Sequence, residues 1–257
     1  MINVLYHANC ADGFTAAWLL ARKFGENNNF FPMNYGDPFP EVSSDDIYIV
    51  DFCCEVPVNN KVFIFDHHIG AKDLYDKMKG RIDPASKFDI NECGSSLVQR
   101  YLSMVYGSAL GQYVKDRDLW RWALPYSREV NAVIQSTAFT FRNWDVLNTR
   151  IEERLDLVIT EGETILSVQD KIIKDTKAEE INGIKYVNTH CLKSEVGNHH
   201  GPGPVVVWHV HDCTVYGSVR GKGALEIAKK YGGGGHALAA GFRCTLTEFV
   251  IERTKPV

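Results

Sequence analysis

The chain has 257 residues, of which 45% are hydrophobic and 23% charged, a balance that is typical of a globular protein and excludes a disordered or fibrous one. Its length allows one large domain or two modest ones, since domains run to about 100–200 residues. The formal charge of -4 argues against a broad cationic surface for long duplex DNA, because such binding neutralises many phosphates with Lys and Arg. Short or small phosphate-bearing ligands stay compatible with this charge.

The first residues, MINVLYHANC, have no basic stretch followed by a long apolar one, and no later run approaches the roughly 18 apolar residues of a membrane span. We therefore expect a cytoplasmic protein without a membrane partner. The seven cysteines are odd in number and lack paired CxxC spacing. This pattern favours reduced thiols over a disulfide framework or a structural zinc site.

Short apolar runs alternate with helical segments in the N-terminal half. Residues 2–6 predict a strand that ends at His7, and GFTAAWLLARKFG predicts a helix that ends at Gly25. Further strands are predicted over 30–34, 47–50 and 61–65. The alternation predicts an α/β fold whose N-terminal lobe is a mostly parallel sheet with helices on both faces.

The remaining chain predicts a helical connector and a second, smaller lobe. A helix follows Gly94, and charged helices are predicted over 143–177. Apolar runs at 205–210 and 213–219, a helix near 222–231 and a last strand at 241–245 predict a smaller α/β domain. We therefore predict three parts, which are a metal-binding catalytic domain over 1–125, a helical connector over 126–180 and a C-terminal domain over 181–257.

The segment IFDHHIG places an acid and two imidazoles directly after a predicted strand, as Asp66, His67 and His68. Carboxylate oxygen with neutral imidazole nitrogen suits manganese, iron or zinc more than calcium. The alternative is that these residues form hydrogen bonds within a loop. In open sheets, ligands bind outside the carboxyl ends of the strands, and three of the predicted strands deliver acidic or His residues there.

Three further signals are weak when taken singly. Asp51 follows a strand, where many acids merely stabilise a turn. His7 and Asp12 lie in the first strand–helix loop, where Asp12 can instead be the helix N-cap. In the segment KDRDLW, either Asp116 or Asp118 can be a metal ligand or a partner of a neighbouring Arg.

Four successive glycines precede His236, and they let the backbone approach an anion closely and turn N–H groups toward it. The alternative is a flexible loop. His209 and His211 alternate along a predicted strand and share a face. We interpret that face as solvated rather than as a metal pair.

Together these elements, in this order, resemble the DHH phosphoesterase superfamily over nearly the whole chain. The specific parts are the DHH triplet after a strand and the C-terminal SVRG…GGGGHALAAGF. The latter looks like the DHH-associated domain that binds substrate phosphate. The resemblance implies a two-lobed enzyme with manganese or a similar metal. Its members include short-oligonucleotide phosphodiesterases, single-strand exonucleases, exopolyphosphatases and inorganic pyrophosphatases.

The resemblance also implies the site residues. The metal ligands are matched by His7, Asp12, Asp51, His67 and Asp116, with Asp118 as the rival of Asp116. The catalytic residues are matched by Asp66, His68, Arg220 and His236. The substrate-binding residues are matched by Arg220, Gly233, Gly234, Gly235 and His236. In this assignment Asp51 bridges two ions, Asp66 orients a neighbouring histidine, and His68 faces the phosphate or the leaving group.

One position departs from the family. Cys10 stands where the first motif usually has an acid, so one ion position lacks a carboxylate. Either Cys10 itself binds metal as a thiolate, which favours a softer metal, or that position is weak. We accordingly expect one or two divalent ions, with Mn²⁺ favoured.

The sequence therefore predicts a metal-dependent phosphoesterase that hydrolyses short oligonucleotides or small nucleotides with a metal-activated water. One alternative is a phosphomonoesterase or exopolyphosphatase of the same superfamily. The other is a catalytically weak nucleotide-binding module.

Overall fold

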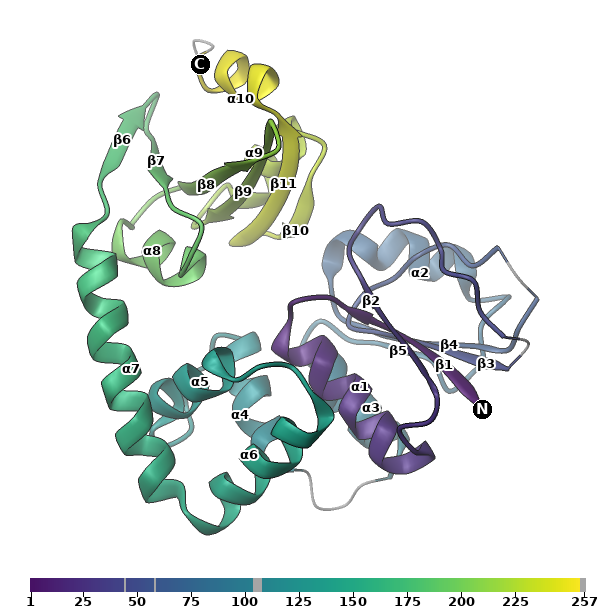
Figure 1. Ribbon diagram of the computed structural model, residues 1–257. Coiled ribbons are helices and arrows are strands. Elements are labelled where there is room, and N and C mark those ends of the chain that lie inside the picture. The colour runs from purple at the N-terminus through teal and green to yellow at the C-terminus, as the bar shows by residue number, and fades with distance from the viewer. Residues whose placement is uncertain (44, 58, 104–107, 255–257) are drawn as a thin grey trace. The chain divides into compact units, whose positions relative to one another are not determined.

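The computed structural model describes residues 1–43, 45–57, 59–103 and 108–254. The chain divides into two compact units, Met1–Leu166 and Ser167–Val257. Each unit contains its own sheet (Figure 1).

The N-terminal unit is built on a parallel sheet of five strands in the order β2-β1-β3-β4-β5. The strands are β1 (Ile2–His7), β2 (Asn29–Met33), β3 (Asp46–Val50), β4 (Val62–Asp66) and β5 (Lys87–Phe88). Every residue of β4 is buried, as expected for a strand covered on both faces. The mostly parallel sheet predicted from the apolar runs is confirmed.

Helices cover both faces of this sheet (Figure 1). Helices α1 (Ala11–Phe24) and α3 (Gly94–Tyr101) share a core with one face, while a 3₁₀ turn (Ile69–Ala71) and α2 (Lys72–Met78) lie on the other. Trp18 of α1 is fully buried, and its indole N–H donates to Asp145 Oδ1 at 2.9 Å. The helix predicted after Gly94 ends at Tyr101, and residues 104–107 lie outside the described residues.

Most of the segment predicted as a connector packs into the N-terminal unit. It contains α5 (Ser127–Ser136) and α6 (Phe141–Glu153), which pack with α4 (Ala109–Asp118) and α1. Trp144 of α6 is fully buried, and its Nε1–H donates to Thr15 Oγ1 of α1 at 3.0 Å. The unit boundary falls inside α7 (Leu155–Asp175), after Leu166, instead of at residues 125 and 180. The many charged residues of this segment predicted a solvated connector, but α5 and α6 each have a buried apolar face.

We expect Trp144→Ala to lower the free energy of unfolding by about 3–5 kcal/mol, because it leaves a cavity in the core and removes the hydrogen bond to Thr15 Oγ1. Urea denaturation followed by circular dichroism measures the change. Val146→Ala on the same helix, where the side chain is 53% exposed, serves as the control and should cost less than about 0.5 kcal/mol. Equal losses in both variants would show that α6 is not anchored by Trp144.

The C-terminal unit has a six-stranded sheet in the order β10-β11-β9-β8-β7-β6. All neighbouring strands are antiparallel except β7 and β8, which are parallel. The strands are β6 (Ala178–Ile181), β7 (Ile184–Asn188), β8 (Val205–His211), β9 (Thr214–Arg220), β10 (Gly234–His236) and β11 (Ala239–Thr245). The hairpin of β6 and β7 turns at Asn182 and Gly183, which both have positive φ.

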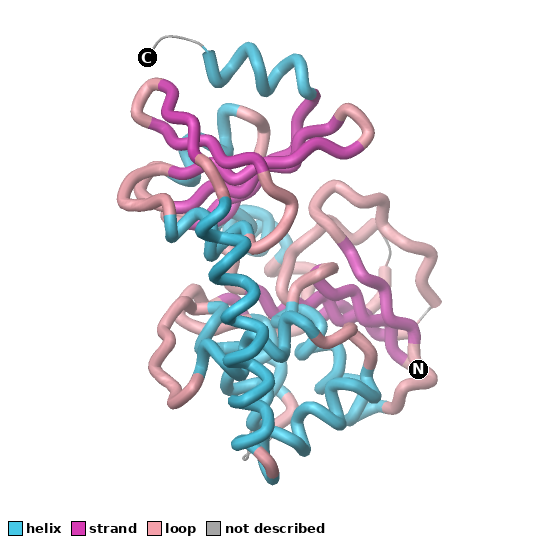
Figure 2. The backbone as a smooth tube through the Cα atoms, turned by 60° about the vertical axis from the view of Figure 1, so that its left-hand side comes forward, coloured by secondary structure: helices cyan, strands magenta, loops and turns pink. Residues whose placement is uncertain are grey.

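Helices also lie on both faces of the C-terminal sheet (Figure 2). Helix α8 (Lys193–His199) packs on the face that includes Val205 and Val207 of β8. Helices α9 (Ala224–Lys230) and α10 (Leu246–Thr254) pack on the opposite face, around Phe249. The predicted second α/β lobe is therefore present.

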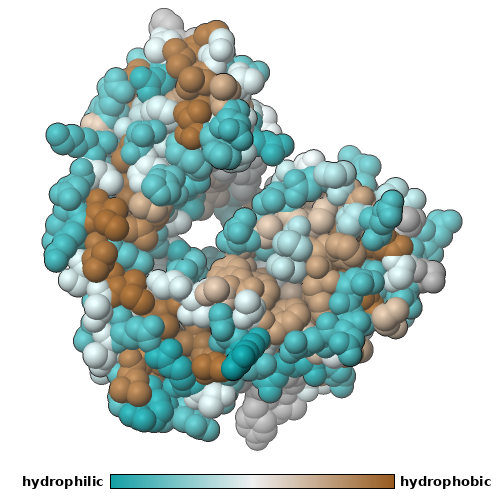
Figure 3. All heavy atoms as spheres, viewed as in Figure 1, coloured by the Kyte–Doolittle hydropathy of each residue, from teal (hydrophilic) through white to brown (hydrophobic). Residues whose placement is uncertain are grey.

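Helix α7 exposes several apolar side chains, which Figure 3 shows in brown along that helix. Among them are Leu157, Val168 and Ile172, each at least 40% exposed. The helix nevertheless carries charged residues throughout its 21 residues. In the part of the chain that the structure describes, no helix has the length and apolar character to cross a bilayer.

Candidate metal centre

Three strands of the N-terminal sheet end in side chains that can bind metal. His7 is the last residue of β1, Asp51 directly follows β3, and Asp66 ends β4. The strand order reverses direction between β1 and β3, the place where parallel α/β sheets bind ligands. Asp51 has φ 63, an unusual backbone conformation for a residue other than glycine. Its N–H donates to Phe65 O of β4 at 2.9 Å.

Asp51 belongs to two groups whose possible ligand atoms lie within 4.8 Å of one another. One group is His7, Asp51 and His68, and the other is Asp12, Asp51 and His67. His67 Nε2 lies 3.2 Å from Asp51 Oδ1, and His7 Nδ1 lies 3.4 Å from Asp51 Oδ2. Asp51 therefore lies where one carboxylate can contact two cations, the position expected of a bridging ligand.

Asp12 lies in the first turn of α1, but it caps a different helix. Its carboxylate accepts hydrogen bonds from the N–H groups of Gly94 and Ser95 and from the Ser95 hydroxyl, at the start of α3. The residue in the N-cap position of α1 is Cys10. The alternative that Asp12 is the N-cap of its own helix is therefore wrong, and two helices jointly fix its carboxylate in the cluster.

Asp66 holds His68 in one orientation. Its Oδ1 accepts from the His67 and His68 N–H groups and lies 2.8 Å from His68 Nδ1. This contact fixes the His68 ring through Nδ1, as second-sphere carboxylates do for histidines at metal sites. The rings of His7 and Tyr35 contact the His68 ring, at centroid distances of 5.8 and 6.2 Å. No sequence pattern had indicated Tyr35.

The structure corrects the choice between Asp116 and Asp118. Asp116 points into the loop that follows α4, where its oxygens accept from Ala123 N, Leu124 N and Ser127 Oγ. Asp118 Oδ2 instead lies 3.5 Å from His67 Nε2. Residues two apart on a helix point about 200° away from each other, so only one of these acids can face the cluster. Asp116 is a loop-fixing residue.

Cys93 belongs to the cluster, whereas Cys10 belongs to none of the three groups found in the described part of the N-terminal unit. The third group is Asp12, Cys93 and Asp118. Cys93 precedes α3 and is fully buried. The sequence signal was a cysteine before Gly94 at the start of a predicted helix, which alone does not distinguish a metal ligand from an N-cap.

The charges of this cluster favour a cation. Burial raises the pKa of Asp12, and the nearby carboxylates of Asp51 and Asp118 raise it further. Burial opposes ionisation of Asp51 as well, but contacts with His67 and His7 hold its pKa well below the ordinary value. Burial lowers the pKa of His67, yet Asp51 and Asp118 outweigh this effect and raise it to about 10. The three carboxylates thus attract positive charge.

Unpaired carboxylate oxygens also indicate a metal site. Asp51 Oδ2 and Asp66 Oδ2 are buried without a hydrogen-bond partner among the described residues, and so is Asp118 Oδ2. Buried polar atoms normally have partners, so each such atom requires an explanation. A bound divalent ion would satisfy the oxygens of Asp51 and Asp118, and the donor set of carboxylates and imidazoles suits such an ion.

The phosphate-binding residues predicted in the C-terminal unit share one sheet face. Arg220 ends β9, Ala239 lies opposite it on β11, and His236 lies opposite Ala239 on β10. Two strand spacings separate these positions, so the Cα atoms of Arg220 and His236 are about 9–10 Å apart. Ser194 Oγ of α8 accepts from Arg220 Nη2 at 2.7 Å and fixes the guanidinium group.

The glycine run forms the turn after α9 and the start of β10. The N–H groups of Gly232 and Gly233 donate to carbonyls at the end of α9, so they are not directed at an anion. A Cβ on Gly233 would lie 2.1 Å from Gly241 O, which explains the need for glycine there. The Gly233 N–H is therefore not available to an anion, and the predicted part of Gly233 in the phosphate cradle would rest on close backbone approach. Gly234, whose added Cβ would meet nothing within 4 Å, is the open position beside Gly235.

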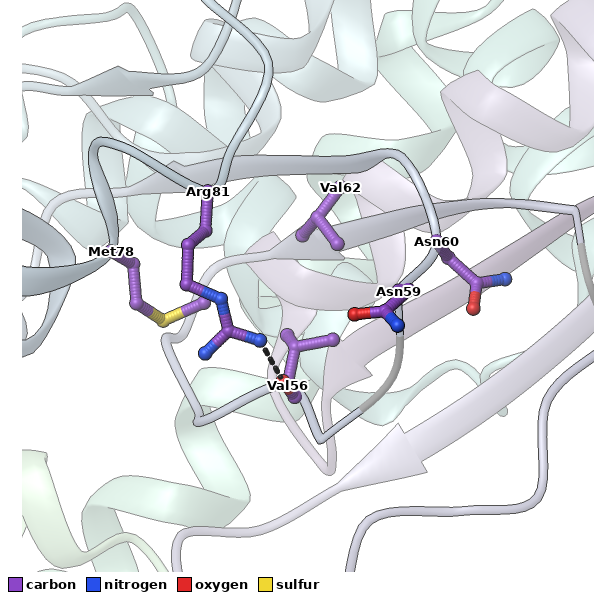
Figure 4. Close-up of a pocket in the computed structure, with 6 residues that line it drawn as sticks. All are labelled: Val56, Asn59, Asn60, Val62, Met78 and Arg81. Atoms are coloured by element: carbon purple, nitrogen blue, oxygen red, sulfur yellow. Dashed lines mark hydrogen bonds between the residues drawn. The ribbon is translucent and has the colours of Figure 1, made fainter.

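A separate cavity of about 230 Å³ lies beside the amino end of β4 (Figure 4). Its lining includes Val62, Met78 and Arg81, and Arg81 Nη2 donates to Val56 O at 2.9 Å. Asp66 and the cluster lie at the other end of the same strand. This cavity is therefore not part of the candidate metal centre.

Comparison by sequence finds distant similarity. No family model matches the chain. An uncharacterized protein, R106 of Acanthamoeba polyphaga mimivirus, is 25% identical over 93% of this chain. The matched region covers 66% of that relative, so the chain spans slightly less than two thirds of its length.

Comparison with solved structures identifies the fold. The chain is similar to a pGpG-specific phosphodiesterase, PggH, from Vibrio cholerae, with a TM-score of 0.51, 12% identity and coverage of 97% of this chain and 96% of that one. The chain is also similar to an exopolyphosphatase-related protein from Bacteroides fragilis, with a TM-score of 0.52 and 13% identity. That match covers 97% of this chain and 89% of the other one. RecJ from Thermus thermophilus in complex with Mn²⁺ matches with a TM-score of 0.50 and 15% identity. That match covers 97% of this chain and half of the other one.

These proteins belong to the DHH superfamily of phosphoesterases. The chain has their α/β fold, with a parallel sheet and a second sheet. The resemblance predicted from the DHH triplet and the GGGGH run is thus confirmed at the level of the fold. The acidic cluster described above lies at the carboxyl end of the parallel sheet.

Proposed function

We propose that the chain is a metal-dependent phosphoesterase of the DHH superfamily. The observation that carries this proposal is the cluster at the carboxyl edge of the sheet, in which Asp12, Asp51 and His67 are buried and His7 and Asp118 are partly exposed. These residues would hold a divalent metal, with Mn²⁺ the first to test, and the ion would supply Lewis acidity and lower the pKa of a bound water. Asp51 lies between the two groups and is the proposed bridging ligand.

His68 is the proposed proton donor. Hydrolysis adds a water oxygen to phosphorus and breaks a P–O bond, and the departing oxygen needs a proton. Because His68 Nδ1 is held by Asp66 Oδ1, the ring is fixed with Nε2 as the nitrogen for the substrate. Asp66 acts through His68 and is a positioning residue. Within the C-terminal unit, Arg220 and His236 are the proposed phosphate-binding residues, because a guanidinium and an imidazole can neutralise phosphate charge.

We further propose short oligonucleotides or small nucleotides as substrates, because the phosphate-binding face also carries aromatic groups. Tyr216 of β9 lies on the same face as Arg220, opposite His209 on one side and Arg243 on the other. The His209 ring stacks on Tyr216 at a centroid distance of 5.3 Å with an interplanar angle of 19°. Pyrophosphate has no base to stack, so this row favours a nucleotide.

A groove of about 830 Å³ adjoins this row, and its lining includes His190, His209 and His211. His209 Nδ1 is buried without a hydrogen-bond partner among the described residues. The interpretation of His209 and His211 as a solvated face therefore fits His211, whose side chain is 74% exposed, better than His209. The groove is large enough for part of a nucleotide.

A product assay tests the proposed function. The full chain with Mn²⁺ is offered di- to pentanucleotide RNAs, pyrophosphate and polyphosphate in parallel. We expect nucleoside monophosphates from the RNAs and no release with EDTA. Orthophosphate from polyphosphate, without any nucleotide product, would replace this substrate class by an exopolyphosphatase activity. No product from any substrate, with metal bound, would favour a nucleotide-binding module.

We expect Tyr216→Ala to lower kcat/KM for a pentanucleotide by roughly 10-fold, because base stacking on an aromatic side chain contributes about 1–3 kcal/mol. A small aryl phosphodiester that does not reach this row should be cleaved at the wild-type rate. Thr214→Ala, on the same strand and face, serves as the control. Equal losses on both substrates would argue against base stacking at Tyr216.

A further inference from the structure

Cys93 has a place in the metal centre that the family resemblance does not assign. Its Sγ, a carboxylate oxygen of Asp12 and one of Asp118 lie within 4.8 Å of one another. Three ligand atoms spaced evenly around one ion at about 2.0–2.3 Å are about 3.5–4.0 Å apart, so these three atoms need to move inward by at most roughly 0.5–0.8 Å to share an ion. The Cys93 side chain is fully buried.

The start of α3 fixes this geometry. The N–H groups of Gly94 and Ser95 donate to Asp12, so the residue before them lies beside that carboxylate. Gly94 permits the approach, because a Cβ there would lie 2.7 Å from Asp51 Cβ and 3.0 Å from Asp12 Oδ2. The start of α3 at Cys93-Gly94-Ser95 thus packs closely against Asp12 and Asp51.

A second observation indicates a cation at this point. The Asp51 side chain is fully buried, and its Oδ2 has no hydrogen-bond partner among the described residues. Asp118 Oδ2 also has none. The groups are contiguous, because Asp12 is shared by the Cys93 group and by the Asp51 and His67 group. These oxygens lie near the rings of His67 and His7 but accept no hydrogen bond from the described residues, so a cation bound beside Asp12 would satisfy them.

We propose that Cys93 is a metal ligand, whose thiolate holds an ion together with Asp12 and Asp118, beside Asp51 and His67. On binding, the S–H proton passes to solvent and a sulfur–metal bond forms. A thiolate added to carboxylates and an imidazole makes the position favour Zn²⁺, Fe²⁺ or Co²⁺ over Mg²⁺. This assignment rests on the metal centre of the proposed function and names its metal class.

Cys10 provides a matched control. Both cysteines occupy the N-cap position of a helix, Cys10 before α1 and Cys93 before α3. Serine is a favourable N-cap, so serine at either position preserves the helix start. Only Cys93 lies in a group with two carboxylates. The two Cys→Ser variants therefore differ in the ligand that they remove.

Cobalt binding reads out the thiolate directly. The full-length chain, reduced and kept anaerobic, is titrated with Co²⁺ and followed by absorption spectroscopy. We expect a thiolate-to-cobalt charge-transfer band in the near ultraviolet for the wild type and for Cys10→Ser. Cys93→Ser should lack the band and bind Co²⁺ about 10–100-fold more weakly by calorimetry. A band that persists in Cys93→Ser, or disappears in Cys10→Ser, overturns the proposal.

A measurement on the wild type avoids dependence on the variants. X-ray absorption of the zinc-loaded chain should show one sulfur neighbour at about 2.3 Å, and a shell of nitrogen and oxygen alone overturns the proposal. Hydrolysis is scored separately. A sulfur ligand without hydrolysis of any phosphoester contradicts the proposed function alone, whereas hydrolysis without a sulfur ligand contradicts the Cys93 assignment alone.

Discussion

Asp51→Asn is expected to lower the rate of phosphoester hydrolysis by more than about 100-fold. Removing a residue that only supports a metal ligand already lowers metal affinity or activity by up to about 100-fold, and Asp51 is proposed to bind the metal itself. The physical reason is the shared position of Asp51, which lies within 4.8 Å of the ligand atoms of both His7 with His68 and Asp12 with His67. An amide keeps the shape but removes the charge that two cations would share. Calorimetric titration with Mn²⁺ and the nucleotide-release assay measure the two losses.

The same variant should lose its stabilisation by metal. A ligand that binds only the folded state at about 100 times its Kd stabilises that state by about 2.7 kcal/mol. We expect this increment in urea denaturation of the wild type and little of it in Asp51→Asn. Asp46→Asn, at the opposite end of the same strand, is the control and should retain both. An unchanged metal affinity in Asp51→Asn would exclude Asp51 as a ligand.

The parallel sheet and its reactive edge were predictable because they follow from local patterns. Strands β1, β3 and β4 are apolar runs, and each is immediately followed or ended by a side chain that can bind metal. Parallel strands share their carboxyl edge, so His7, Asp51 and Asp66 had to meet once the runs paired. The DHH triplet could be recognised from three consecutive residues, without information on contacts between distant segments.

Contacts between distant segments were not predictable in the same way. Cys93 lies beside Asp12 because α3 starts against α1, although the two residues are far apart in the chain. Trp144 likewise contacts Thr15 of α1, and the charged composition of α6 does not indicate this contact. One missed element had a local signal, since Asn182-Gly183 is a favoured hairpin turn between β6 and β7.

Asp118→Asn and Asp116→Asn are expected to separate metal binding from stability. Asp118 faces His67, and its side chain is 23% exposed. Its loss should weaken Mn²⁺ binding and hydrolysis by about 100-fold, the magnitude associated with disrupted metal sites. The free energy of unfolding without metal should change little, because Asn at this position removes the cost of burying a charge and the repulsion from Asp51, which offset the lost attraction to His67. Calorimetry and urea denaturation test both statements.

Asp116→Asn should give the opposite pattern. Burial raises the pKa of Asp116, but hydrogen bonds from Ser127, Ala123 and Leu124 outweigh it and hold the pKa below its ordinary value. These bonds fix a loop in which Trp120 and Trp122 adopt positive φ. Replacing the charged acceptor should lower the free energy of unfolding by about 2 kcal/mol. Metal affinity should stay within a factor of about two, whereas a large loss of affinity at full stability would restore Asp116 as the ligand and remove Asp118.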